Sequence, residues 1–293
     1  EQPKKMSPEA MEGLQVASAG VGLVPCPVGD APIPPMNNLR PPNPASRAGK
    51  ITLMEILVAV AVIVVLIAIG NTVMKSSREK KNLAGATKKL QAIGEALKSY
   101  TDDSGGLLPF EDAPGKDDWN TAGKPEATEV WYNALPKRLG ASPVADLIDS
   151  PEEFYQDSYP LYIKGAPYPK SDKKLSKPYF AFGMNSRLQR KSEDGIKQQG
   201  TIAAILKPAS TVVFLERGLP KDKKVSKIQG GFDAGAKANP RAFAARHNQK
   251  GILLFADGHT EVHALSDLVD KSGRIIFPQD NIVWTPDPDQ DPN

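Results

Sequence analysis

A nearly uninterrupted apolar run from Ile51 to Ile69 constrains this chain more than any other feature. Only Thr52 and Glu55 interrupt the run, and Gly70 closes it. A helix of these 19 residues would be about 28 Å long, which matches the hydrocarbon core of a bilayer, roughly 30 Å thick. The run therefore predicts one membrane-spanning helix over residues 51–70.

Composition narrows the classes of function. Among 293 residues, 37 Lys and Arg stand against 34 Asp and Glu, so the formal net charge is +3. This balance is too close to neutral to favour nucleic-acid binding, and we expect no nucleic-acid partner. The chain has a single cysteine, Cys26, which excludes an intrachain disulfide and a cysteine-based zinc or iron–sulfur site.

Residues 1–50 differ in composition from the span that follows them. They hold ten of the 27 prolines and show no helical or strand periodicity, so we expect a disordered leader. A start at Met36 would leave a polar leader carrying Arg40, Arg47 and Lys50. Residues 1–35 would then be an upstream extension.

Beyond the apolar run, the sequence predicts that the same helix continues to about Asp103. No proline occurs in this stretch before Pro109. Apolar residues recur at alternating spacings of three and four: Leu83, Ala86, Leu90, Ile93, Leu97, Tyr100. Such a stripe is typical of an amphipathic helix with one side packed on a globular domain. We therefore expect a membrane half, 51–70, and an amphipathic half, 71–103.

The remaining sequence predicts a small globular α+β domain over residues 104–284. Four segments are strand candidates: Tyr179 to Gly183, Thr211 to Leu215, Ile252 to Ala256, Thr260 to Leu265. Asp257-Gly258 joins the last two and predicts a two-residue hairpin turn of type I′, in which both residues have positive φ.

The sequence also predicts a surface loop, a short helix and a C-terminal tail. Residues 109–125 are predicted to form a long surface loop, and residues 129–139 a helix interrupted by Pro136. Residues 285–293 form an acidic, proline-rich tail that we expect to be loose. Its aspartates suggest a calcium site, but calcium needs 6–8 oxygens in a closed geometry, so a solvated tail is the favoured interpretation.

Glu55 is the one acidic residue inside the predicted span. A carboxylate there costs about 2.5–3.5 kcal/mol on insertion scales, so it calls for a partner. Cleavage between Lys50 and Ile51 would create an amino group four residues away on the same helix face. In a filament, the Ile51 amine of one subunit could meet Glu55 of its neighbour. The alternative is an acid tolerated near the membrane interface.

The residues from Ile51 to Val58, ITLMEILV, closely resemble the N-terminal signal of type IV prepilins and type II secretion pseudopilins. In these families a small residue, usually Gly, precedes Phe-Thr-Leu-Ile-Glu and an apolar helix. The resemblance implies that prepilin peptidase exposes and N-methylates Ile51, and that Glu55 is the acid at the fifth position. Here Lys50 precedes the implied cut, and Gly49 lies one position further back. A cut after Gly49 would make Glu55 the sixth residue.

A second resemblance lies near the other end of the chain. His247 is followed by nine residues and then Asp257-Gly258, which is a C-terminal motif of a group of pilin-like proteins. Residues 89–103 also resemble the end of the long helix in that group. The two resemblances cover both ends of residues 51–265. They imply a pilin-like fold, a long helix packed on a small antiparallel sheet, but no chemistry for the motif.

The resemblance implies a pilin-like subunit, or pseudopilin, processed by prepilin peptidase and assembled with other pilin-like subunits into a type II secretion or type IV pilus-like filament. Before assembly, a single span would contact inner-membrane lipids, with the C-terminal domain in the periplasm or outside the cell. The alternative is an uncleaved, membrane-anchored periplasmic binding module, in which Glu55 would tolerate substitution.

Charges near the span favour the opposite orientation. Four basic residues follow the span and three precede it: Lys75, Arg78, Lys80, Lys81 and Arg40, Arg47, Lys50. The positive-inside rule places the more basic flank in the cytoplasm. The resemblance places the leader there instead, because prepilin processing needs a cytoplasmic leader, and we adopt that orientation.

The histidines suggest a metal site as a further interpretation. All three lie within 17 residues, near two acidic side chains: His247, His259, His263, Asp257, Glu261. On a strand, His259, Glu261 and His263 would share one face, which would suit a weak divalent site or a metal-dependent enzyme. We favour a structural role instead, in which His247 hydrogen-bonds to the Asp257-Gly258 turn. Since the sequence has no nucleophile elbow and no phosphate loop, we expect neither an enzyme nor a cofactor.

Overall fold

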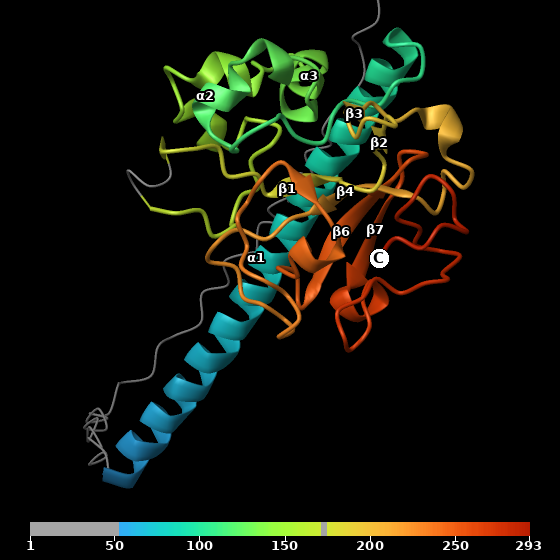
Figure 1. Cartoon of the computed structure of the whole chain (residues 1–293). Coiled ribbons are helices and arrows are strands. Elements are labelled where there is room, and N and C mark those ends of the chain that lie inside the picture. Colours follow the sequence, from blue (N-terminus) through green and yellow to red (C-terminus); the bar gives the residue numbers. More distant parts are fainter. Residues whose placement is uncertain (1–52, 171–174) are drawn as a thin grey trace, which may run out of the picture. The chain divides into compact units, whose positions relative to one another are not determined.

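The structure is a computed structural model that describes residues 53–170 and 175–293. The expected disorder of residues 1–50 and the predicted cleavage residues Gly49, Lys50 and Ile51 fall outside the described residues. The helices are α1 (Leu53–Asp103), α2 (Trp119–Ala122) and α3 (Trp131–Arg138). The strands are β1 (Phe182–Asn185), β2 (Arg190–Lys191), β3 (Lys197–Gln198), β4 (Val212–Glu216), β5 (Lys237–Ala238), β6 (Lys250–Phe255) and β7 (Thr260–Ala264) (Figure 1). Short 3-10 helices lie between them: η1 (Pro125–Ala127), η2 (Val144–Leu147), η3 (Glu153–Tyr155), η4 (Ile202–Ala204), η5 (Pro240–Ala242), η6 (Leu265–Asp267).

Helix α1 confirms the predicted long helix as one element of 51 residues. In its first half, the large apolar side chains from Leu53 to Met74 are 51–81% exposed. Among the described residues, α1 is the one helix that is long and apolar enough to cross a membrane. Because so large an apolar surface is unfavourable in water, lipid or other helices must cover it.

The second half of α1 buries the predicted stripe. Its side chains are at most 4% exposed at five of the six positions: Ala86, Leu90, Ile93, Leu97, Tyr100. Leu83, at the start of the stripe, is half-buried. The stripe shares one core with Phe214 of β4 and with Ile252 and Leu254 of β6, and Figure 1 shows this part of α1 against the sheet.

The sheet has the strand order β5-β1-β4-β6-β7 and is antiparallel except for the pair β1–β5. Successive side chains of a strand point to opposite faces. Ile252 and Leu254 of β6 belong to the core shared with α1, whereas Leu253 and Phe255 belong to a second core with Trp284. Both faces are therefore covered. This explains why β4 and most of β6 are apolar without alternation, and it confirms the α+β fold class.

The four predicted strands exist with shifted ends. Segment 179–183 becomes strand only at Phe182, and segments 211–215, 252–256 and 260–265 correspond to β4, β6 and β7. The strands β2, β3 and β5 have two residues each, which is too short to leave a periodic pattern in the sequence.

Two predictions about the helical region are wrong in detail. The loop at 109–125 contains α2, whose first N–H groups are capped by Asp118, because its Oδ1 accepts from Thr121 N at 2.8 Å. Helix α3 includes Pro136 instead of being interrupted by it. Trp131 and Leu135 of α3 are fully buried, and this packing holds the helix although Pro136 lacks an N–H donor.

The expectation of a loose tail is also wrong. The side chain of Asn293 accepts from Ile275 N at 2.8 Å and donates to Ile275 O at 3.0 Å. Thr285 is 4% exposed, and the carbonyl of Pro286 accepts from Leu206 N at 3.0 Å. These bonds involve backbone groups far away in the sequence, so the composition of residues 285–293 gives no sign of them.

Candidate functional site

The two halves of the C-terminal motif lie at opposite ends of β6. His247 exchanges backbone hydrogen bonds of 2.9 and 3.1 Å with Lys250, the first residue of β6, whereas Asp257-Gly258 follows its last residue, Phe255. A strand of six residues is about 20 Å long, so the motif does not form one site. The prediction that His247 hydrogen-bonds to the turn is wrong.

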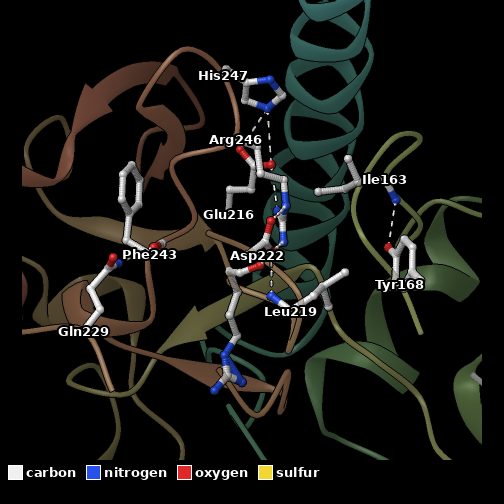
Figure 2. Close-up of polar contacts among 10 residues, drawn as sticks. Ile163, Tyr168, Glu216, Leu219, Asp222, Gln229, Phe243, Arg246 and His247 are labelled. Carbon is white, nitrogen blue, oxygen red and sulfur yellow. Dashed lines mark hydrogen bonds and ion pairs between the residues drawn. The ribbon is translucent and has the colours of Figure 1, made fainter. Parts of the chain in front are cut away.

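His247 belongs instead to a buried group of charged side chains, the Glu216 cluster: Glu216, Asp222, Arg246, His247 (Figure 2). Arg246 is its centre. Nη1 of Arg246 donates to Glu216 Oε1 at 2.8 Å, and its Nε donates to Asp222 Oδ1 at 3.0 Å. Nε2 of His247 lies 3.1 Å from Glu216 Oε2. All four side chains are at most 8% exposed, so the cluster is buried.

The cluster joins three parts of the chain. Glu216 ends β4, Asp222 lies in the following loop, and Arg246 and His247 lie in the segment that leads into β6. Nη2 of Arg246 donates to Asp222 Oδ2 and to the carbonyl oxygen of Arg217, both at 2.5 Å. Each nitrogen of the guanidinium group therefore has an acceptor. The cluster links the end of β4 to the segment that leads into β6.

The charges in the cluster stabilise one another. Burial would raise the pKa of the Glu216 carboxyl group, but the Arg246 guanidinium, helped by His247, outweighs burial and holds that pKa below its ordinary value. Burial would likewise lower the pKa of Arg246, but Glu216 and Asp222 raise it. Two carboxylates and one guanidinium leave a formal charge of −1.

Sequence reasoning identified one member of this cluster, His247, and missed Glu216, Asp222 and Arg246. A signal existed for two of them. Glu216 directly follows the apolar segment 211–215, and Arg246 directly precedes His247. A charged residue at the end of a buried strand requires a partner of opposite charge. Asp222, in a loop, carries no such signal.

The Asp257-Gly258 half of the motif forms a hairpin turn, but not the predicted type I′ turn. Gly258 N donates to Phe255 O at 3.0 Å, and Phe255 N donates to His259 O at 2.9 Å. Gly258 has a φ of +95°, whereas Asp257 is not among the residues with positive φ. The loop therefore has three residues, 256–258, with glycine in the left-handed position that such loops favour.

The turn lies against the amphipathic half of α1. A Cβ atom on Gly94 of α1 would lie 3.0 Å from Leu254 Cδ1 and 3.6 Å from Gly258 O. The absence of a side chain at Gly94 thus allows the end of β6 to approach the helix closely. The two halves of the motif therefore flank β6. His247 anchors the start of the strand through Glu216, and Asp257-Gly258 forms the turn beside α1.

The remaining histidines lie beside the turn and on β7. The carboxylate of Glu261 lies between them, 2.7 Å from His263 Nε2 and 3.4 Å from His259 Nε2, so the predicted shared face is confirmed. The ring of His259 also stacks on Phe255, with centroids 4.4 Å apart. Within residues 53–170 and 175–293, no group of three or more His, Cys, Asp or Glu side chains could hold a metal ion. His247 lies with Glu216 and away from these side chains.

Glu55 lies in the first turn of α1, and its side chain is exposed. Its expected partner in a filament, the amino group of Ile51, belongs to the part of the chain that the structure does not describe.

Comparisons with protein-family models, with curated proteins and with solved structures found no match to this chain. A long apolar helix that continues onto a small sheet is compatible with a pilin-like fold.

Proposed function

We propose that this chain is a pilin-like subunit, stored in the inner membrane and assembled into a type II secretion or type IV pilus-like filament after cleavage and N-methylation by prepilin peptidase. The observation that carries the proposal is the change of character along α1. One uninterrupted helix has large apolar side chains exposed from Leu53 to Met74, and a single buried stripe from Ala86 to Tyr100.

An exposed apolar half-helix suits both states of such a subunit. Lipid tails are as apolar as leucine, so little hydrophobic free energy separates a helix in lipid from a helix packed on other helices. The side chains that stabilise storage in the membrane can therefore form the filament core. The amphipathic half carries the globular domain out of the membrane or core as one rigid extension of the same helix.

Glu55 would supply the specificity that apolar packing lacks. In the filament, its carboxylate would pair with the N-methylated amine of Ile51 on a neighbouring subunit. A buried ion pair adds little net stability, but it disfavours every register in which one charge is left unpaired. The pair would therefore set the axial position of one subunit against the next.

Processing provides the test of this proposal. In cells with active prepilin peptidase and assembly machinery, the sheared filament fraction should contain the chain from Ile51; with inactive peptidase, the chain should remain uncut in the membrane. Lys50→Gly, which places a small residue before the cut, should raise the processed fraction measured by immunoblot. Arg47→Gly removes the same charge from the leader and serves as the matched control. A chain that stays uncut and membrane-bound in both strains would contradict the proposal and favour the anchored binding module.

A further inference from the structure

A groove along α1, just beyond its exposed apolar half, is lined by positive side chains. It has a volume of about 810 Å³, and residues 78–89 of α1 form one wall, while Asp157 and residues 163–165 form the other. We call it the basic groove. Its cationic residues are Arg78, Lys81, Lys88, Lys89 and Lys164.

Small residues make room in the groove. Gly85 lies in its helical wall, and a Cβ atom there would meet nothing within 4 Å. Gly165 has a φ of +85° and lies so close to Asn82 that a side chain there would clash with it. The loop is thus held against the helix beside an open space at Gly85.

Two of the five cations form hydrogen bonds or ion pairs with other parts of the fold. Nζ of Lys89 donates to the carbonyl oxygens of Asp157, Tyr159 and Tyr162 at 2.7–2.9 Å. Lys164 pairs with the carboxylate of Asp157 at 2.9 Å.

The other three cations lie exposed on one face of α1, because their spacings of three and seven residues correspond to one and two helical turns: Arg78, Lys81, Lys88. Within the described residues, no carboxylate lies within 4.0 Å of these three side chains. Their charges are therefore available to an anion in the groove.

The end of the groove nearest the span, at Arg78 and Lys81, lies at the depth of lipid phosphates if α1 spans the bilayer. Met74 is the last large exposed apolar residue of α1, and Arg78 and Lys81 follow it by about 6 and 10 Å along the helix. Each head-group layer is about 5–8 Å thick, and long side chains lean toward the N-terminus of their helix, here toward the membrane. The charged ends of Arg78 and Lys81 would therefore reach the phosphate layer.

We propose that the basic groove binds the phosphate head group of an anionic phospholipid in the leaflet from which the domain emerges. The proposal requires the membrane span but neither cleavage nor filament assembly, so each can fail without the other. It also gives a role to Arg78 and Lys81, two of the four basic residues after the span, which the positive-inside rule alone places on the wrong side. Their charges would serve head-group binding instead of setting the orientation.

Spin-labelled lipids test this binding in the full chain. The protein is reconstituted into phosphatidylcholine vesicles with a trace of spin-labelled phosphatidylglycerol or phosphatidylcholine, and electron paramagnetic resonance gives the relative association constant. The wild type should prefer phosphatidylglycerol. Arg78→Gln combined with Lys81→Gln and Lys88→Gln should lower this preference at least about fivefold, the effect of one Lys or Arg at a membrane surface.

Two further variants separate the groove from charge in general. Lys221→Gln combined with Lys223→Gln and Lys224→Gln removes the same charge from an exposed loop and should preserve the preference. Gly85→Leu keeps every charge but fills the groove, so it should lower the preference as the first variant does. Fluorescence of the buried tryptophans verifies that each variant is folded.

Four results would overturn the proposal. The wild type could show no preference for phosphatidylglycerol. The loop variant could lose the preference as completely as the groove variant, or Gly85→Leu could leave it unchanged, and both outcomes would indicate diffuse surface charge. Finally, excess inorganic phosphate could abolish the preference at constant ionic strength, which would indicate a site for free anions and not for lipid.

Discussion

Glu55→Ala is expected to abolish filament assembly while the chain still inserts into the membrane. Removal of the carboxylate makes the span more apolar, so insertion becomes easier by up to about 2.5–3.5 kcal/mol. In the proposed filament, the same change would leave the Ile51 amine of the neighbouring subunit buried without its partner, a loss of about 3–5 kcal/mol at each contact. Because the contact repeats along the filament, assembly should fail. Sheared filaments and membrane fractions, compared by immunoblot, measure the two outcomes.

Two variants determine whether charge is responsible. Glu55→Gln keeps the shape and the hydrogen-bonding oxygen but not the charge, and it should fail in the same way. Val58→Ala shortens another exposed side chain about one turn along and should still assemble. Filaments of normal number and length from Glu55→Ala would rule out a role for Glu55 in setting the register between subunits. Helix α1 would then be a simple anchor.

Arg246→Met should lower the free energy of unfolding of the domain by about 3–5 kcal/mol. The substitution preserves much of the buried volume but leaves the carboxylates of Glu216 and Asp222 without their guanidinium partner. The three tryptophans, Trp119, Trp131 and Trp284, are all at most 8% exposed in the domain. Denaturant unfolding of the full chain in detergent, followed by tryptophan fluorescence, therefore reports on the domain and not on the span.

The pH dependence of the loss of unfolding free energy in Arg246→Met identifies the charge responsible. The folded-state pKa of Glu216 is lowered, so its contribution to wild-type stability is complete above the unfolded pKa of about 4.3 and disappears as pH falls through the folded value. In Arg246→Met, burial should raise the pKa of Glu216, and the carboxyl group can then fold in its neutral form at low pH. The difference between the two proteins should therefore be largest near neutral pH and shrink toward about pH 4.

Lys98→Met provides the matched control for Arg246→Met. Lys98 pairs with Asp102 at 2.6 Å, but the two side chains are 77% and 63% exposed. Loss of such a surface pair should cost about 0–1 kcal/mol at any pH. Equal losses in the two variants, or a pH-independent loss in Arg246→Met, would show that the Glu216 cluster does not stabilise the domain through its charges.

The parts of the fold that sequence predicted well depend on local patterns. The long helix follows from an apolar run and a stripe with the helical period, both of which lie within neighbouring residues. The hairpin of β6 and β7 likewise follows from two short strand-like segments joined by Asp257-Gly258. In each case the pattern that determines the structure spans a few turns or strands, so it is visible in the sequence.

The parts that sequence reasoning missed depend on contacts between distant residues. Glu216 and Arg246 meet across 30 positions, and Asn293 is held by Ile275 through backbone groups that no side-chain pattern marks. The nine-residue spacing of His247 and Asp257 suggested one site, but an extended strand between them separates the two residues. Only the path of the backbone decides between these arrangements.

The most direct test of a pilin-like subunit is the mass and N-terminal sequence of the protein from native membranes and filaments. We predict a chain that begins at Ile51 and carries one additional methyl group on its amine. Such a chain would establish both the cut after Lys50 and the amine expected to meet Glu55. A chain that retains residues before Ile51 would contradict the account and identify α1 as the anchor of an uncleaved protein.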